Sequence, residues 1–210
     1  DEADDADVGF VSPEAIEYAP AEQQPSKRSL SAQEKAEIFE TLDPSGLRLD
    51  NIDWVVFTWM VTVHAGALAA PFFFSWSGLA VCLVLHWLTC SIGICLGYHR
   101  YLAHKSLKLR QPSEFFVLLC GGLSGEGSPL QWSANHRVHH QRSDMKGDPH
   151  SPFDGTFWSH ITWLFLRHRP GHKERLFRNY IPELVDRPLL KFFHRTEVFW
   201  LVAFGVVLLA

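Results

Sequence analysis

The chain has 210 residues, a formal net charge of -4 and 47% hydrophobic residues. This length leaves room for one domain of ordinary size, and the absence of a cationic excess gives no reason to expect nucleic-acid binding. The four cysteines lie in apolar runs without a CxxC spacing, which argues against both a disulfide scaffold and a cysteine metal site.

The N-terminal part of the chain is acidic and rich in proline. Residues 1–30 combine three prolines with an acidic tip and therefore predict a disordered tail. Ser31 and Glu34 then have the spacing of a capping box, which predicts a short helix to about Leu42. We expect residues 1–50 to form this tail and helix, and residues 51–210 to form one domain.

The next segment carries no Asp, Glu, Lys or Arg between Trp54 and His99. A bilayer core needs roughly 20 helical residues, so the segment predicts two membrane spans, at about 54–72 and 77–98. A soluble hairpin is the alternative, but helices that are apolar on all sides are rare in soluble domains. A further span begins near 198 and is cut off at Ala210, so we expect a C-terminally truncated fragment.

The distribution of positive charge predicts how this hairpin is oriented. The turn between the spans has no cation, whereas Arg48 precedes the first span and four cations follow the second: Arg100, Lys105, Lys108 and Arg110. Because positive residues favour the cytoplasmic side, we expect both ends of the hairpin to face the cytosol or a plastid stroma.

Three shorter segments follow the hairpin. Residues 115–125 are apolar but too short to span and contain three glycines, which favours a half-inserted or protein-covered helix. The aromatic run 157–166 ends in cations and predicts a helix lying at the membrane interface. Residues 170–195 are basic and interrupted by three prolines.

Two histidine clusters stand out after the charge-free segment. His136, His139 and His140 follow a helix-start pattern at Ser128, so they share one helical face as potential ligands of one or two metals. His99 and His104 lie five residues apart, about 140° around an α-helix, and can reach one centre only where the helix ends or bends. An all-imidazole site suits zinc, copper, iron or nickel.

The other histidines have less specific surroundings. We expect His64 and His86, inside the spans, to be neutral and bonded to a neighbouring helix; axial ligation of a haem is the alternative. His168, His172 and His194 lie among cations and predict interfacial or solvated side chains.

Between about Leu88 and Arg169 the sequence resembles the Δ9-type branch of the membrane-bound fatty acid desaturases. The resemblance rests on four segments, which are Leu96-Gly-Tyr-His-Arg100 with Leu102-Ala-His104-Lys-Ser106, Trp132 with Asn135-His-Arg-Val-His-His140, Asp148-Pro-His-Ser-Pro152, and Phe157-Trp-Ser-His160 with Trp163. It implies an all-α integral membrane protein whose histidine-rich helical cap faces the cytosol or stroma, with residues 51–210 as an incomplete desaturase domain.

The resemblance also implies an oxidoreductase that uses two irons and O2 to introduce a cis double bond into an acyl chain. Electrons would come from a separate ferredoxin or cytochrome b5. No catalytic residue is implied beyond the iron ligands, which would be His99, His104, His136, His139 and His140. Candidates for residues that orient these ligands are Asn135, Asp144, Asp148, His150 and His160.

Two departures from the family pattern qualify this interpretation. A third histidine box is absent, so we expect the fragment alone to be inactive. Ala134 and Asn135 occupy positions where acyl-CoA enzymes carry Arg-Asp, which favours an acyl-lipid over an acyl-CoA substrate. The membrane would be that of a plastid or the endoplasmic reticulum. A lipid hydroxylase or ketolase on the same scaffold, or an inactive desaturase-like scaffold, is the alternative.

Overall fold

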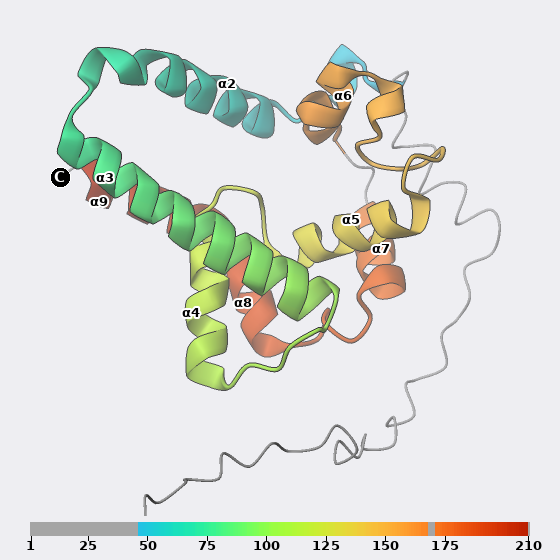
Figure 1. Ribbon diagram of the computed structural model, residues 1–210. Helices are drawn as coiled ribbons and strands as arrows, with labels where there is room; N and C mark the ends of the chain where they lie inside the picture. The colour runs from blue at the N-terminus through green and yellow to red at the C-terminus, as the bar shows by residue number, and fades with distance from the viewer. Residues whose placement is uncertain (1–45, 168–170, 210) are drawn as a thin grey trace, which may run out of the picture.

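The computed structural model describes residues 46–167 and 171–209, and within these residues the chain is helical without a β-strand (Figure 1). The acidic tail, the predicted helix to Leu42 and His168 lie outside the described residues. Helices of 3-10 or π type carry the label η and α-helices the label α. The all-α fold class predicted from the sequence is confirmed.

Two long apolar helical segments form the predicted hairpin. The first, Trp54–Phe73, consists of α2 (Trp54–Ala69) and η4 (Ala70–Phe73); the second, Trp76–Ala103, consists of α3 (Trp76–His86) and η5 (Trp87–Ala103). In its most apolar stretch, the first segment has 0% of its residues buried by protein and the second has 11%. A water-soluble chain rarely exposes so continuous an apolar surface, so we assign both helices to a membrane. The second helix runs five residues beyond the predicted end at 98.

Each of the two helices of the hairpin begins at a capping side chain. Asp53 accepts hydrogen bonds from the backbone N–H of Val55 and Val56, and Ser75 accepts one from Gly78. Figure 1 shows α2 and α3 diverging from their shared turn. The start of α2 is also bonded to a distant part of the chain. The N–H of Asp53 donates to the carbonyl of Phe165 at 2.7 Å, in η7 (Thr162–Phe165).

Helix α4 (Gln111–Gly122) packs along η5 through glycines. A Cβ added to Gly93 would lie 2.4 Å from the backbone nitrogen of Gly121, and one added to Gly121 would lie 2.5 Å from the Tyr98 ring. Small residues allow two helix backbones to approach closely within a membrane. The apolar segment with three glycines is therefore a short helix covered by protein on one face, as the sequence predicted.

The main core lies below the hairpin, where the end of η5 meets α4, α5 (Pro129–Arg142), α7 (His172–Tyr180) and α8 (Pro188–Arg195). Ser128 caps α5 by accepting a hydrogen bond from the N–H of Gln131 at 3.3 Å, as its sequence pattern predicted. Helix α9 (Glu197–Leu209) supplies the third apolar segment. Both histidine clusters therefore lie on helices anchored in one core.

The aromatic run 157–166 is not the single helix that the sequence predicted. It forms α6 (Thr156–His160) and then η7, after η6 (Pro152–Asp154). The backbone leaves helical geometry at Ile161, and the Thr162 hydroxyl donates to the carbonyl of Phe157 at 3.2 Å. A side-chain bond of this kind competes with the helical backbone ladder.

Two of the three histidines expected to be interfacial or solvated are not. His172 is 1% exposed because the face of α7 that carries it packs against α5, and burial, followed by nearby Arg175 and Lys173, lowers its pKa to about 4. His194 is half-buried, and its Nδ1 lies 2.6 Å from the Ser128 hydroxyl. Clustering with cations in the sequence therefore did not identify surface histidines.

Candidate metal centre

His99 and His104 lie close together because of an unusual helix. Segment η5 is a π-helix of 17 residues, and the N–H of His104 bonds the carbonyl of His99 at 2.9 Å. Hydrogen bonding between residues five apart stacks their side chains along one face, which an α-helix would not do. The two imidazole centroids are consequently 4.4 Å apart. The sequence allowed the two histidines to reach one centre only where the helix ends or bends, and the helix does end here, with His104 as its C-cap residue.

Helix α5 brings two more imidazoles to the same point. Nε2 of His136 lies 3.2 Å from Nε2 of His104 and 3.0 Å from Nε2 of His140. The indole of Trp132 stacks on His136 with ring centroids 4.7 Å apart. One ligand atom from each of His99, His104, His136 and His140 falls within 4.8 Å of the others, which defines the four-histidine cluster.

The surroundings of this cluster favour uncharged imidazoles. Burial and then the neighbouring histidines lower the pKa of His136 to about 3, and the same two causes lower the pKa of His140. A neutral imidazole has the free lone pair that a metal requires. Four imidazole nitrogens in one place suit zinc, copper, iron or nickel, so the cluster can hold a metal ion.

His139 stands apart from the other four predicted ligand histidines. Its ring centroid is 6.5 Å from that of His136 and 5.9 Å from that of His140. It instead forms a second group with Asp148 and His150, whose ring stacks on it at 4.4 Å. The structure thus divides the five predicted ligands into a set of four and a single histidine.

Asp148 is the residue that fixes His139. Its fully buried carboxylate oxygens accept from His139 Nδ1 at 2.9 and 3.0 Å and from the backbone N–H of Asp144 and His150. Burial alone would raise the pKa of Asp148, but these hydrogen bonds lower it below its usual value. A carboxylate on Nδ1 leaves Nε2 of His139 available for a metal. The side chain of Asp144, by contrast, is exposed.

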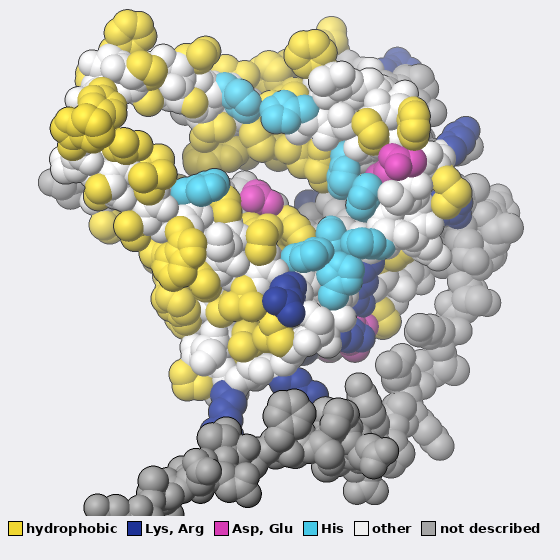
Figure 2. All heavy atoms as spheres, in the orientation of Figure 1, with side chains coloured by type: hydrophobic (Ala, Val, Ile, Leu, Met, Phe, Trp, Pro, Cys, Tyr) yellow, Lys and Arg dark blue, Asp and Glu magenta, His cyan; other side chains and the backbone are white. Residues whose placement is uncertain are grey.

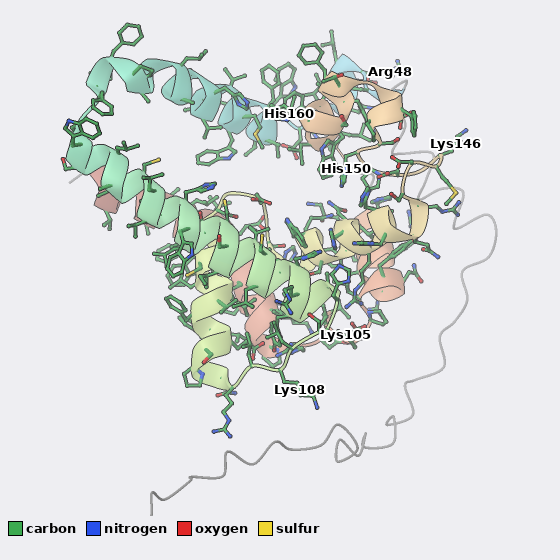
Figure 3. All side chains as sticks on the ribbon, in the orientation of Figure 1. Arg48, Lys105, Lys108, Lys146, His150 and His160 are labelled. Atoms are coloured by element: carbon green, nitrogen blue, oxygen red, sulfur yellow. The ribbon has the colours of Figure 1, made fainter. Side chains whose placement is uncertain are left out.

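The other two candidates for ligand-orienting residues, Asn135 and His160, make different contacts. Asn135 accepts a hydrogen bond from the Gln131 amide at 3.0 Å on the same helix. His160 is exposed, and its ring centroid lies 6.4 Å from that of His64. Figure 3 shows His150 and His160 on the segment that follows α5, on the side of the molecule where α2 begins.

The two histidines inside the spans bond within their own helix rather than to a neighbour. Nδ1 of His64 donates to the carbonyl of Met60 at 2.7 Å, and Nδ1 of His86 lies 3.5 Å from Sγ of Cys90. Among the described residues neither histidine has the expected hydrogen bond to a neighbouring helix, although the ring of His64 contacts that of His160 in α6.

A cavity of about 900 Å³ adjoins the four-histidine cluster. Trp59 and Met60 of α2 line one wall, and Trp132 and His136 of α5 line another. Figure 2 shows histidine side chains gathered around this hollow. The sequence did not identify Trp59, since one aromatic residue inside an apolar span gives no signal of which way it faces.

Arg137 is a second residue that the sequence did not single out. Its guanidinium contacts Ala103 at the end of η5 and Tyr180 at the end of α7, although it lies between two box residues. The one signal in the sequence was its position inside the histidine cluster, but a cation next to histidines also fits a solvated surface.

The sequence was compared with known proteins. The fatty acid desaturase family model matches residues 74–210. The sn-1 stearoyl-lipid 9-desaturase of Anabaena variabilis is 38% identical over 160 residues, which is 75% of this chain and 58% of that protein. The sn-2 palmitoyl-lipid 9-desaturase of Nostoc sp. is 36% identical over 81% of this chain and 60% of its own length.

A plant desaturase has a similar sequence identity to this chain. The Delta-9 acyl-lipid desaturase 2 of Arabidopsis thaliana is 34% identical over 77% of this chain and 52% of its own length. The chain thus spans between half and three-fifths of these relatives. The family match covers α3 to α9 and includes both histidine clusters together with Asp148. The chain therefore belongs to the fatty acid desaturase family.

Proposed function

We propose that the complete protein is an iron- and O2-dependent fatty acyl desaturase of Δ9-like type, which introduces a cis double bond into a lipid-linked acyl chain. The observation that carries this proposal is the convergence of His99, His104, His136 and His140 at the end of a membrane-spanning helix, beside a large cavity. The names of the cyanobacterial and plant relatives support the reaction and the acyl-lipid substrate.

The four-histidine cluster would hold one iron. His139, oriented by Asp148, would serve a second iron. Bound iron would supply the oxidising power to break an unactivated C–H bond, which no side chain in the cavity could do alone. Two hydrogens from the acyl chain, with two electrons and two protons from outside, reduce O2 to two waters; ferredoxin or cytochrome b5 would supply the electrons.

The cavity fits an acyl chain that enters from the membrane. Its volume of about 900 Å³ is within the usual range for ligand sites, and Trp59 and Met60 place one wall on a span. Ala134 is uncharged and fully buried in the core. The chain therefore presents no cation at the position where acyl-CoA enzymes carry arginine. This supports a lipid-linked substrate over an acyl-CoA.

The charges support an orientation with the histidines on the cytosolic or stromal side of a plastid or endoplasmic reticulum membrane. Arg48, Lys105, Lys108 and Lys146 all lie at the end of the molecule away from the inter-span turn (Figure 3). The turn, residues 70–75, contains no charged residue. This is the asymmetry expected under the positive-inside rule.

The test is expression of the full-length protein in a host whose lipids lack the product, followed by mass spectrometry of the acyl chains. We expect a new cis alkene, which His136→Ala and His139→Ala abolish without reducing the amount of membrane-inserted protein. His64→Gln is the matched control, because the hydrogen bond of His64 is to the carbonyl of Met60 in its own helix and its side chain is not part of the four-histidine cluster, so the product should be unchanged. A hydroxylated or keto lipid without a new alkene would contradict the proposal.

A further inference from the structure

Arg137 lies between His136 and Val138 in the second histidine cluster, but its side chain points into protein rather than into the metal site. Its Nε donates to the carbonyl of Ala103 at 3.0 Å and its Nη2 to the carbonyl of Leu102 at 2.8 Å. Its Nη1 donates to the carbonyl of Tyr180 at 2.7 Å. The side chain is 19% exposed. One guanidinium therefore bonds three backbone carbonyls from two other helices.

Two of those carbonyls belong to the last turn of η5. The last carbonyls of a helix have no partner within the helix and need one from outside. Lys105 adopts a left-handed backbone with φ of 53°, which ends the helix directly after His104. Arg137 thus closes the helix end from which His104 projects, while its own backbone neighbour is His136. The Nε2 atoms of these two histidines are 3.2 Å apart.

A carboxylate fixes the guanidinium from the other side. Glu183 Oε1 lies 2.7 Å from Nη1 of Arg137 and 2.8 Å from Nζ of Lys105. The turn that carries Glu183 is itself anchored, because Arg187 pairs with the buried Glu114 of α4 and bonds the hydroxyl of Tyr101 at 3.1 Å. The end of η5, helix α5 and this turn are therefore connected through a single side chain.

We propose that Arg137 is a positioning residue that sets the distance between the histidines at the end of η5 and those of α5. This distance determines the metal affinity of the four-histidine cluster. The inference rests on the proposed function only in requiring that the cluster binds metal. Arginine suits this role because its rigid planar guanidinium spreads its donors over three nitrogens that reach carbonyls on two helices, whereas lysine gathers its donors on one nitrogen at the end of a flexible chain.

The test is Co(II) titration of the full-length, detergent-purified protein, monitored by the visible absorption of the bound metal. The variants are Arg137→Lys and Arg137→Gln, with Arg178→Gln as the control at an exposed arginine of α7. We expect both Arg137 variants to retain wild-type helicity by circular dichroism, to bind Co(II) about 10- to 100-fold more weakly and to show a shifted spectrum. The control should match the wild type.

Wild-type Co(II) affinity and spectrum in Arg137→Lys would overturn the proposal, since charge alone would then suffice. If both Arg137 variants fail to fold, Glu183→Gln decides, because it removes the charge that fixes the guanidinium of Arg137 while Arg137 itself remains. A several-fold weaker affinity with intact helicity would support the proposal, and unchanged affinity would overturn it. Failure of the wild-type protein to bind Co(II) would instead contradict the proposed function.

Discussion

Asp144 and Asp148 are equivalent as sequence candidates, but the structure gives them different surroundings. The carboxylate of Asp148 is buried and bonded to His139, whereas that of Asp144 is exposed. Only the backbone N–H of Asp144 takes part, as a donor to Asp148 at 3.0 Å. Sequence spacing alone could not separate the two, because the loop after α5 determines which one turns inward.

We therefore predict different effects of Asp148→Asn and Asp144→Asn. Asparagine at 148 keeps the shape but loses the negative charge that orients His139, so metal affinity should fall by about 10- to 100-fold. Asp144→Asn should bind metal as the wild type does. Metal content per protein, measured by elemental analysis after dialysis against a weak chelator, checks both. Equal losses in the two variants would show that Asp148 has no specific role.

At the scale of the element, the π-helix is the feature that the sequence could least predict. The ligand face of α5 followed from α-helical spacing, and the structure has His136 and His140 side by side as that spacing requires. His99 and His104 meet at the end of a π-helix, and no residue in the apolar run 87–98 predicts this wider winding. Charge-free composition predicts that a span exists but not how tightly it is wound.

The packing of α4 on η5 gives a prediction at this scale. Gly93→Ala would place a Cβ 2.4 Å from the backbone nitrogen of Gly121, and backbone cannot move aside cheaply, so unfolding should become easier by about 1–3 kcal/mol. Gly66→Ala in α2 meets nothing within 4 Å and should leave stability unchanged or slightly higher. Thermal unfolding of the two variants in the same detergent tests the difference. A wild-type melting temperature for Gly93→Ala would mean that the two helices are not in close contact.

For the whole molecule, the hairpin and the two clusters could be predicted, but the cavity could not. Spans and boxes are local patterns within one stretch of chain. The cavity instead forms where Trp59 of α2, His136 of α5 and Glu197 of α9 meet, and these residues are far apart in the sequence. The splayed arrangement of α2 and α3 follows from contacts of α2 with η7, which no periodicity encodes.

The predicted orientation can be tested with single cysteines in a background without the four native ones. Lys108→Cys lies beyond the second span and Phe73→Cys at the inter-span turn, and both positions are exposed. In sealed vesicles, a membrane-impermeant maleimide should label the two positions from opposite sides, with Lys108→Cys reacting on the cytosolic or stromal side. Labelling of both from one side would show that the hairpin does not cross the membrane.

The winding of η5 also has a consequence for the height of the metal site above the lipid. An α-helix rises 1.5 Å per residue, and a helix that closes its hydrogen bonds one residue later rises less. Because the 17 residues of η5 are wound as a π-helix, His99 and His104 lie closer to the bilayer than they would at the end of an α-helix of the same length. In the proposed reaction, an acyl tail would then need to lift less of its length out of the hydrocarbon to reach the four-histidine cluster. A change in winding upstream of His99 would alter which carbon of the tail arrives there, even with every ligand unchanged.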